Sequence, residues 1–146
     1  MPLAESMCFE DVYEENLRLD RGEKQTIIDD AIAVWMFVDD VLAGETYGVS
    51  PRKLDEPIED YDGGGHGVIY CYSTTMLPSF QRKGLGKILK AFWLGRCKES
   101  GFEKVIGHAT SPAMVEVNRF FGATFGPIHR GWYGTRRVAH FYELPL

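Results

Sequence analysis

The sequence predicts a single domain of mixed α/β class over residues 1–146. Runs rich in β-branched and aromatic residues alternate with helical patterns, in the order hairpin, strand, helix, strand, helix and strand pair. The chain has 146 residues, of which 45% are hydrophobic and 13% aromatic. This length and composition fit one globular core rather than a disordered chain.

The N-terminal part is predicted to contain a helix, a hairpin and a long loop. Residues 8–20 place apolar side chains at helical spacing, opposite acidic ones. Residues 31–49 read as two strands around Asp39-Asp40, a two-residue turn without the usual glycine. Residues 50–67 contain two prolines and three consecutive glycines. This segment is either a functional flap or a disordered excursion.

A buried strand and a helix are predicted next. Residues 68–76, VIYCYSTTM, are typical of a central strand buried on both faces. The following helix has Leu85, Ile88, Leu89 and Phe92 on one stripe, which we expect to face the core.

The C-terminal part predicts three further strands and one helix. Gly101 stands where a glycine cap would end the preceding helix. Residues 104–109 form a short strand, and residues 111–121 form a helix that opens with Ser as N-cap and Pro at the first helical position. The tail reads as two strands around Gly131 and Gly134.

Charge is distributed unevenly along the chain. Residues 1–62 hold 17 acidic against 5 basic residues, whereas residues 63–146 hold 4 against 11. The two halves therefore favour partners of opposite sign, one anionic and one cationic, although solvated surface charge remains an alternative. The acidity disfavours nucleic acid. Five acids cluster in the long loop: Asp55, Glu56, Glu59, Asp60 and Asp62.

Several classes of protein are disfavoured. Cys8, Cys71 and Cys97 are odd in number and lack a CxxC spacing, so neither a disulfide framework nor a metal site is predicted. The acidic N-terminus has no apolar core and is no signal peptide. The longest apolar run, AIAVWMFV, is too short to span a membrane. We expect a cytoplasmic protein without a membrane partner.

The segment LPSFQRKGLGK, residues 77–87, predicts an anion site. It joins a strand to a helix through a glycine turn, which leaves backbone N–H groups unpaired at the positive end of the helix dipole. Arg82, Lys83 and Lys87 add positive charge. The expected ligand is a phosphate or a pyrophosphate.

Two nucleotide motifs fail here, and a third pattern matches. A Walker A loop needs Gly at the position of Gln81, and a Rossmann fingerprint needs Gly or Ala at the position of Leu89. The segment Gln81-Arg82-Lys83-Gly84-Leu85-Gly86 matches Gln/Arg-x-x-Gly-x-Gly/Ala after a strand and an x-x-Pro turn. It resembles the pyrophosphate loop of the GNAT superfamily of acetyl-CoA-dependent N-acetyltransferases. The order of elements over residues 31–146 is similar as well.

This resemblance implies a fold and a co-substrate. The fold would be a mostly antiparallel mixed sheet flanked by helices, with strands 68–76 and 104–109 splayed around the acyl-CoA site. The loop amides would bind the pyrophosphate of acetyl-CoA, and the backbone at the end of strand 68–76 would pair with the pantetheine arm. The implied acetyl-CoA-binding residues are Met76, Leu77, Gln81, Arg82, Lys83, Gly84, Leu85, Gly86 and Lys87.

The catalytic residues depart from the family pattern. Many members place a tyrosine general acid where this chain has Asn118, which can donate a hydrogen bond to sulfur but cannot deliver a proton. A carboxylate base of some members would fall at Tyr70, which is no base near neutral pH. The base is therefore His108, a water relay or an acid of the N-terminal half. His66 and His129 have weaker claims, as does His140.

The resemblance implies acetyl transfer to a primary amine by direct attack in a ternary complex. From the charge pattern we expect a cationic small molecule or a lysine or N-terminal amine, with Trp132 and Tyr133 lining its site. Two other classes stay open: a non-catalytic acyl-CoA-binding module, which Asn118 favours, and a protein-interaction module with an acidic face. Homodimer formation is also open.

Overall fold

The computed structural model describes residues 3–146 and contains one six-stranded sheet. The strand order is β1-β2-β3-β4-β6-β5, and every neighbouring pair is antiparallel except β3 and β4. The predicted mixed, mostly antiparallel sheet is confirmed. The strands are β1 (Ile32–Val38), β2 (Val41–Val49), β3 (Val68–Met76), β4 (Lys104–Ala109), β5 (Thr124–Arg130) and β6 (Val138–Pro145).

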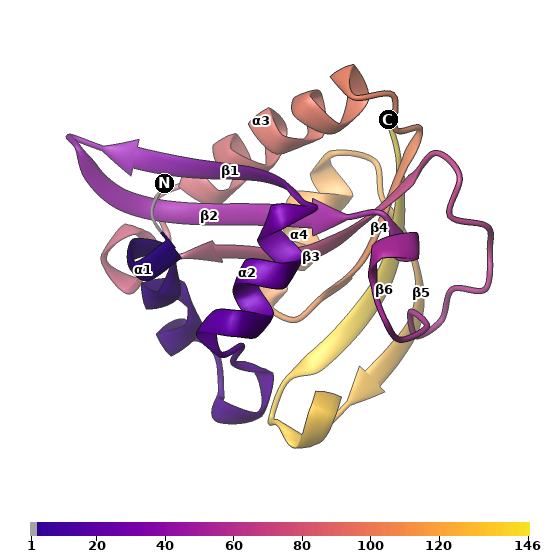
Figure 1. Ribbon diagram of the computed structural model, residues 1–146, viewed down its shortest axis with the longest axis horizontal. Coiled ribbons are helices and arrows are strands. Elements are labelled where there is room, and N and C mark those ends of the chain that lie inside the picture. The colour runs from indigo at the N-terminus through magenta and orange to yellow at the C-terminus, as the bar shows by residue number, and fades with distance from the viewer. Residues whose placement is uncertain (1–2) are drawn as a thin grey trace.

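Helices cover both faces of the sheet (Figure 1). The helices α3 and α4 pack over the main apolar core, on the opposite side of the sheet from α1 and α2. No helix within residues 3–146 is long and apolar enough to cross a membrane. The α-helices are α1 (Leu3–Ser6), α2 (Arg21–Asp29), α3 (Leu85–Glu99) and α4 (Pro112–Phe120). Short 3-10 turns occupy Met7–Val12, Glu15–Leu17, Pro51–Lys53, Pro78–Phe80 and Trp132–Gly134.

The helix predicted over residues 8–20 was wrong. That stretch consists of two 3-10 turns joined by extended residues, and the regular helix α2 follows it. Asp20 caps α2 by accepting a hydrogen bond from the N–H of Glu23, while the Glu23 side chain accepts one from the Asp20 N–H.

A buried ion network explains why the N-terminal segment folds in this way. The ammonium of Lys24 is fully buried and donates to Ser6 O and Glu45 Oε2, each at 2.8 Å, and it lies 2.9 Å from Glu10 Oε2. The indole N–H of Trp35 donates to the other oxygen of Glu45 at 2.8 Å. A buried charge needs such partners, and those of Lys24 on α2 come from α1, the first 3-10 turn and β2. Tertiary contacts therefore override the helical pattern of residues 8–20.

The predicted hairpin of residues 31–49 is confirmed. Asp39 and Asp40 both adopt positive φ angles, 49° and 64°. This is the conformation that a two-residue turn between twisted antiparallel strands requires. Aspartate tolerates the left-handed region better than most residues, so the pair replaces the usual glycine.

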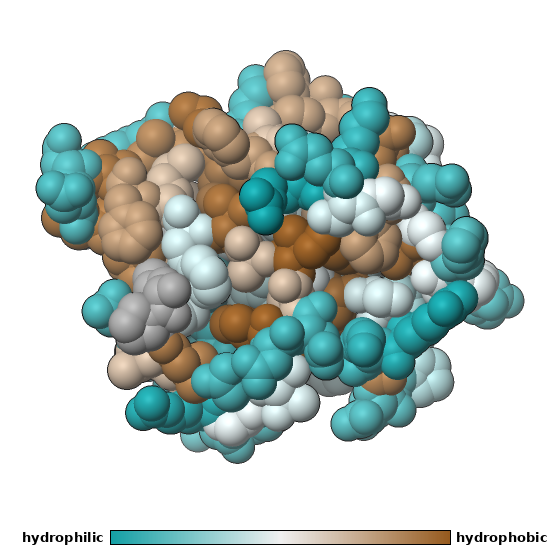
Figure 2. Space-filling view, turned by 45° about the horizontal axis from the view of Figure 1, so that its top comes forward, coloured by the Kyte–Doolittle hydropathy of each residue, from teal (hydrophilic) through white to brown (hydrophobic). Residues whose placement is uncertain are grey.

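The stripe predicted for α3 was only partly right. Leu89 is buried, but Ile88 and Phe92 are 48% and 67% exposed. Apolar residues accordingly remain on the surface, with polar ones around them, as Figure 2 shows for one face of the molecule. The buried face of α3 is made of Leu89, Lys90, Trp93, Leu94 and Cys97.

The buried face of α3 differs from the predicted stripe because it includes Lys90. Its side chain is fully buried, and its Nζ lies 3.2 Å from Cys71 Sγ and 3.1 Å from the Tyr142 hydroxyl. A lysine is rarely buried unless it has partners, so a hydrophobic pattern alone places it on the solvent side.

The predicted helix ends are confirmed. At the end of α3, Gly101 has φ of +92° and its N–H donates to Lys98 O, while Phe102 N–H donates to Cys97 O. At the start of α4, the Ser111 hydroxyl accepts a hydrogen bond from Met114 N–H at 3.2 Å.

The sheet opens between β3 and β4. Their parallel pairing covers Val68–Cys71 on β3 and Lys104–Gly107 on β4, and residues 72–76 have no partner on β4. Residues 108 and 109 stay paired with β6. In Figure 1, β3 runs toward α1, whereas β5 runs toward the lower edge of the view and β6 runs back toward the C-terminus. The two halves of the sheet therefore diverge where the sequence predicted the splay.

Candidate active site

One end of the opening is formed by the glycine loop in front of α3. Arg82 and Gly84 have positive φ angles of 63° and 74°, and Gly84 is the N-cap of α3 without a capping side chain. The N–H groups of Arg82 and Gly84 have no hydrogen-bond acceptor among residues 3–146. Unpaired N–H groups at a helix N-terminus attract anions.

The glycines of this loop leave free space for a ligand. A Cβ atom built on Gly84 would meet nothing within 4 Å, and one built on Gly86 would meet only Met76 Cγ at 3.7 Å. Lys83 and Lys87 lie beside the loop, and the Lys87 ammonium rests 3.2 Å from the ring centre of Phe120 on α4. The loop therefore has the geometry and the charge that a phosphate group needs.

The end of β3 leads from the opening to the loop. Leu77 N–H donates to Ala43 O on β2, and Leu77 O accepts from Phe80 N–H, each at 2.9 Å. Backbone groups in antiparallel strands alternate in direction, so those of Met76 point away from β2 and toward the opening. Met76 O there accepts from Gln81 Nε2 at 3.0 Å. Of the two residues expected to pair with pantetheine, Met76 has the more suitable backbone.

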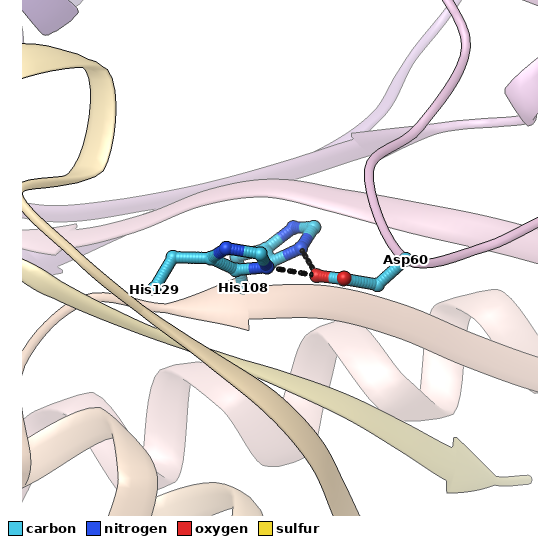
Figure 3. A group of neighbouring side chains, drawn as sticks. All are labelled: Asp60, His108 and His129. Atoms are coloured by element: carbon cyan, nitrogen blue, oxygen red, sulfur yellow. Dashed lines mark hydrogen bonds and ion pairs between the residues drawn. The ribbon is translucent and has the colours of Figure 1, made fainter.

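At the other end of the opening, one aspartate joins two histidines (Figure 3). Asp60 Oδ2 lies 3.0 Å from Nε2 of His108 on β4 and 2.6 Å from Nε2 of His129 on β5. The other ring nitrogen of His108, Nδ1, lies 2.9 Å from the Tyr70 hydroxyl on β3. Residues of the long loop, β3 and β5 therefore meet at His108 on β4.

His108 lies in an aromatic pocket. Only 3% of its side chain is exposed, and the ring packs 4.6 Å from the Trp132 ring and 5.2 Å from the Phe141 ring. Burial lowers the pKa of His108 below its ordinary value, although the hydrogen bond and the charge of Asp60 act in the opposite direction. A neutral imidazole near neutral pH can accept a proton.

Asp60 is held in position by the long loop. Its φ is +68°, and only 10% of its side chain is exposed. Desolvation raises its pKa, but the hydrogen bonds from His108 and His129 outweigh this effect and keep the pKa below its ordinary value. Asp60 is therefore ionised and faces inward, whereas the sequence groups it with the other loop acids expected to attract a cation.

Asp60, His108 and His129 are also residue types that bind zinc. Their candidate ligand atoms lie within 4.8 Å of one another. Each of these atoms already takes part in a hydrogen bond. Within the described residues, Nε2 of each histidine lies within hydrogen-bond distance of the same carboxylate oxygen of Asp60.

Asn118 lies on the other face of the sheet. It is 1% exposed, its Nδ2 donates to Met114 O at 2.9 Å, and its Oδ1 has no hydrogen-bond partner among residues 3–146. Gly107 faces the same side, because a Cβ there would meet the Tyr142 hydroxyl at 2.6 Å. Side chains alternate along a strand, so His108 points the opposite way. The structure brings together His108 with Asp60, but not His108 with Asn118.

The sequence names His108 as a candidate base but does not show which side chains contact it. It gives His129 a weaker claim and excludes Tyr70 as a base near neutral pH. Neither Asp60 nor Tyr70 lies near His108 in the chain, being separated from it by 48 and 38 residues. The one available signal was Asp60 itself, within an acidic loop that precedes the central strand.

Solved structures of acetyltransferases share this fold. No protein-family model and no curated protein matches the sequence. The ribosomal-protein-S18-alanine N-acetyltransferase from Escherichia coli superposes with a TM-score of 0.73 at 14% identity, over 98% of this chain and 86% of that one. A GNAT superfamily phosphinothricin acetyltransferase from Sinorhizobium meliloti, in complex with acetyl-CoA, gives 0.74 at 18% identity, over 100% and 85%.

A third similar structure is a domain of a larger protein. The loading GNATL domain of CurA from Lyngbya majuscula superposes with a TM-score of 0.73 at 19% identity, over 98% of this chain and 92% of that one. These similarities extend over nearly the whole chain, and the sheet opening and the glycine loop lie within them. The chain therefore has the fold of the GNAT-superfamily acetyltransferases.

Proposed function

We propose that this protein is an acetyl-CoA-dependent N-acetyltransferase that acts on a primary amine. The observation that carries the proposal is the combination of an open glycine loop and the His108–Asp60 pair at the two ends of one gap in the sheet. The acetyltransferases of the same fold support it, including those whose structures contain acetyl-CoA.

The residues have separate roles in this proposal. The amides and cations of residues 81–87 bind the pyrophosphate, and the backbone at Met76 pairs with the pantetheine arm. The acceptor nitrogen attacks the thioester directly in a ternary complex, and its proton passes to His108. Asp60 is a positioning residue, because it holds His108 by Nε2 and stabilises the imidazolium that forms.

The acceptor is proposed to be a cationic small molecule, or a lysine or N-terminal amine. Asp55, Glu56 and Glu59 are exposed on the loop that Asp60 anchors above His108. Exposed acids beside an active site raise the local concentration of a cation. Glu10 and Glu45 do not contribute to this attraction, because Lys24 neutralises them inside the molecule.

Acetyl-CoA binding and turnover test the proposal separately. Calorimetry should show one acetyl-CoA site per chain, and a thiol-release assay over a panel of amines should show turnover with at least one cationic amine. Absence of acetyl-CoA binding would overturn the proposal altogether.

A non-catalytic acyl-CoA-binding module is the second candidate. It is favoured by Asn118, which stands where many acetyltransferases of this fold carry a tyrosine general acid. Acetyl-CoA binding without turnover on any amine would support this second function and contradict the first.

A further inference from the structure

The hydrogen bonds of His108 determine which of its nitrogens is basic. Nε2 faces the carboxylate oxygen of Asp60 at 3.0 Å, and an ionised carboxylate only accepts hydrogen bonds. Nε2 therefore carries the hydrogen of the neutral ring. Nδ1 then has the free electron pair, and it accepts the hydrogen bond from the Tyr70 hydroxyl at 2.9 Å.

An acceptor amine has no direct route to that electron pair. The His108 side chain is 3% exposed, with Trp132 and Phe141 packed against its ring. Its one basic atom is already covered by the Tyr70 hydroxyl. Tyr70 stands one residue before Cys71, the last position of β3 that pairs with β4, where the sheet begins to open.

We propose that Tyr70 is the group that takes the proton of the acceptor amine and passes its own hydroxyl proton to Nδ1 of His108. This inference rests on the proposed acetyl transfer and adds a catalytic residue to it.

Atoms and charges balance in this step. The amine nitrogen forms a bond to the acetyl carbon, and the carbon–sulfur bond breaks to release CoA as a thiolate. The amine proton moves to the Tyr70 oxygen as the Tyr70 proton moves to His108. The products are the amide, a thiolate and an imidazolium paired with Asp60, and the imidazolium then returns its proton to the solvent or to the thiolate.

The two proton movements occur together. Burial raises the pKa of Tyr70 far above its ordinary value, so a free tyrosinate does not form. If the Tyr70 hydroxyl gains the amine proton while it gives its own proton to His108, Tyr70 stays neutral throughout the transfer. The titratable groups around His108 are Asp60 and Glu59 from the loop, Tyr70 from β3 and His129 from β5. His129 contacts the same Asp60 carboxylate, and the negative charge of Glu59 raises the pKa of His108 less than Asp60 does.

The decisive variant is Tyr70→Phe, which keeps the ring and removes only the hydroxyl. We expect kcat to fall about 100-fold, the lower end of the range for general acid–base catalysis, while the Kd for acetyl-CoA changes less than about 2-fold. The matched control is Tyr72→Phe on the same strand. Its ring packs edge-on against Tyr70 at 6.2 Å, and it makes no hydrogen bond to His108. Its kcat should stay within about 2-fold of wild type.

Two further measurements separate a relay from a structural role. In mixtures of H₂O and D₂O, the wild-type rate should curve with the deuterium fraction, as two moving protons require, and Tyr70→Phe should give a straight line. Nitrogen NMR of labelled histidine should show His108 with its hydrogen on Nε2, and Tyr70→Phe should shift the signal of Nδ1.

The outcomes distinguish the relay from the proposed function. Wild-type turnover that Tyr70→Phe leaves unchanged would overturn the relay but not acetyl transfer, and so would a hydrogen found on Nδ1 of His108. Loss of wild-type activity in EDTA, restored by Zn²⁺, would also overturn it, because the cluster would then be a metal site. Acetyl-CoA binding without any wild-type turnover would contradict the proposed function itself.

Discussion

Asp60 lies 3.0 Å from His108, although 48 residues separate them in the chain. This contact connects the long loop to β4, and it also acts against the lowering of the His108 pKa by burial. Burial lowers the pKa of His108, and the hydrogen bond and charge of Asp60 raise it. Among the groups around His108, Asp60 is the one that most strongly opposes the effect of burial on its pKa.

Asp60→Asn should move the acid limb of the pH–rate profile to lower pH. An amide keeps the shape of the side chain but removes the charge that stabilises the imidazolium, so the pKa of His108 falls further below its ordinary value of about 6.5. A less basic His108 also lowers the plateau rate, by roughly 10-fold if about one pKa unit is lost. The measurement is kcat/KM between pH 5 and 9.

The control for this prediction is Asp55→Asn on the same loop, whose side chain is exposed. It should leave the acid limb in place. A limb that moves to higher pH in Asp60→Asn, or that does not move, would show that Asp60 does not tune His108.

Gly86→Glu should abolish acetyl-CoA binding without unfolding the protein. A Cβ at this position meets only Met76 Cγ at 3.7 Å, so the glutamate fits, but it places a negative charge where the pyrophosphate is proposed to lie. Gly95→Glu is the matched control. It adds the same charge to the same helix, in open space two turns away.

Calorimetry with acetyl-CoA checks this pair of variants. We expect no measurable heat of binding for Gly86→Glu and a Kd within about 3-fold of wild type for Gly95→Glu. Equal affinity in both variants would show that the glycine loop does not bind the pyrophosphate.

Lys24→Met should destabilise the fold by about 3–5 kcal/mol, the usual cost of removing one partner from a buried ion pair. The change leaves the carboxylates of Glu10 and Glu45 buried without their cation. Urea denaturation at pH 7 measures the free energy of unfolding. The control is Lys53→Met, because the Lys53–Asp30 pair is 3.8 Å apart and more than half exposed. That variant should change stability by less than about 1 kcal/mol. A loss as small as this in Lys24→Met would mean that the network does not hold the N-terminal segment.

The sequence correctly predicted the turn and the helix ends that are determined by residues close together in the chain. The Asp39-Asp40 turn, the Gly101 cap and the Ser111 N-cap each depend on a few neighbouring residues, and each is present. The failures involve buried charges. Lys24 and Lys90 look like surface residues in the sequence, but their partners are brought to them by other strands and helices. The same holds for Asp60, whose two histidines come from β4 and β5.

Neutralising the three exposed loop acids together, by Asp55→Asn, Glu56→Gln and Glu59→Gln, should raise KM for a cationic amine several-fold at low salt. Asp60 is left unchanged in this variant, because its carboxylate contacts His108 and His129. The three charges attract a cation toward the loop above His108, and exposed charges act over about 10 Å at 0.1 M salt. The difference in KM from wild type should therefore shrink as salt rises, while the Kd for acetyl-CoA stays unchanged.

The matched control removes two acids elsewhere, by Asp39→Asn and Asp40→Asn at the hairpin turn, where asparagine also tolerates the positive φ angles. KM should then stay near the wild-type value. Steady-state kinetics at about 0.02 M and 0.3 M salt give the comparison. If both variants raise KM equally, the effect comes from the net charge of the molecule. If neither does, the acids of the loop are solvated surface and do not select the acceptor.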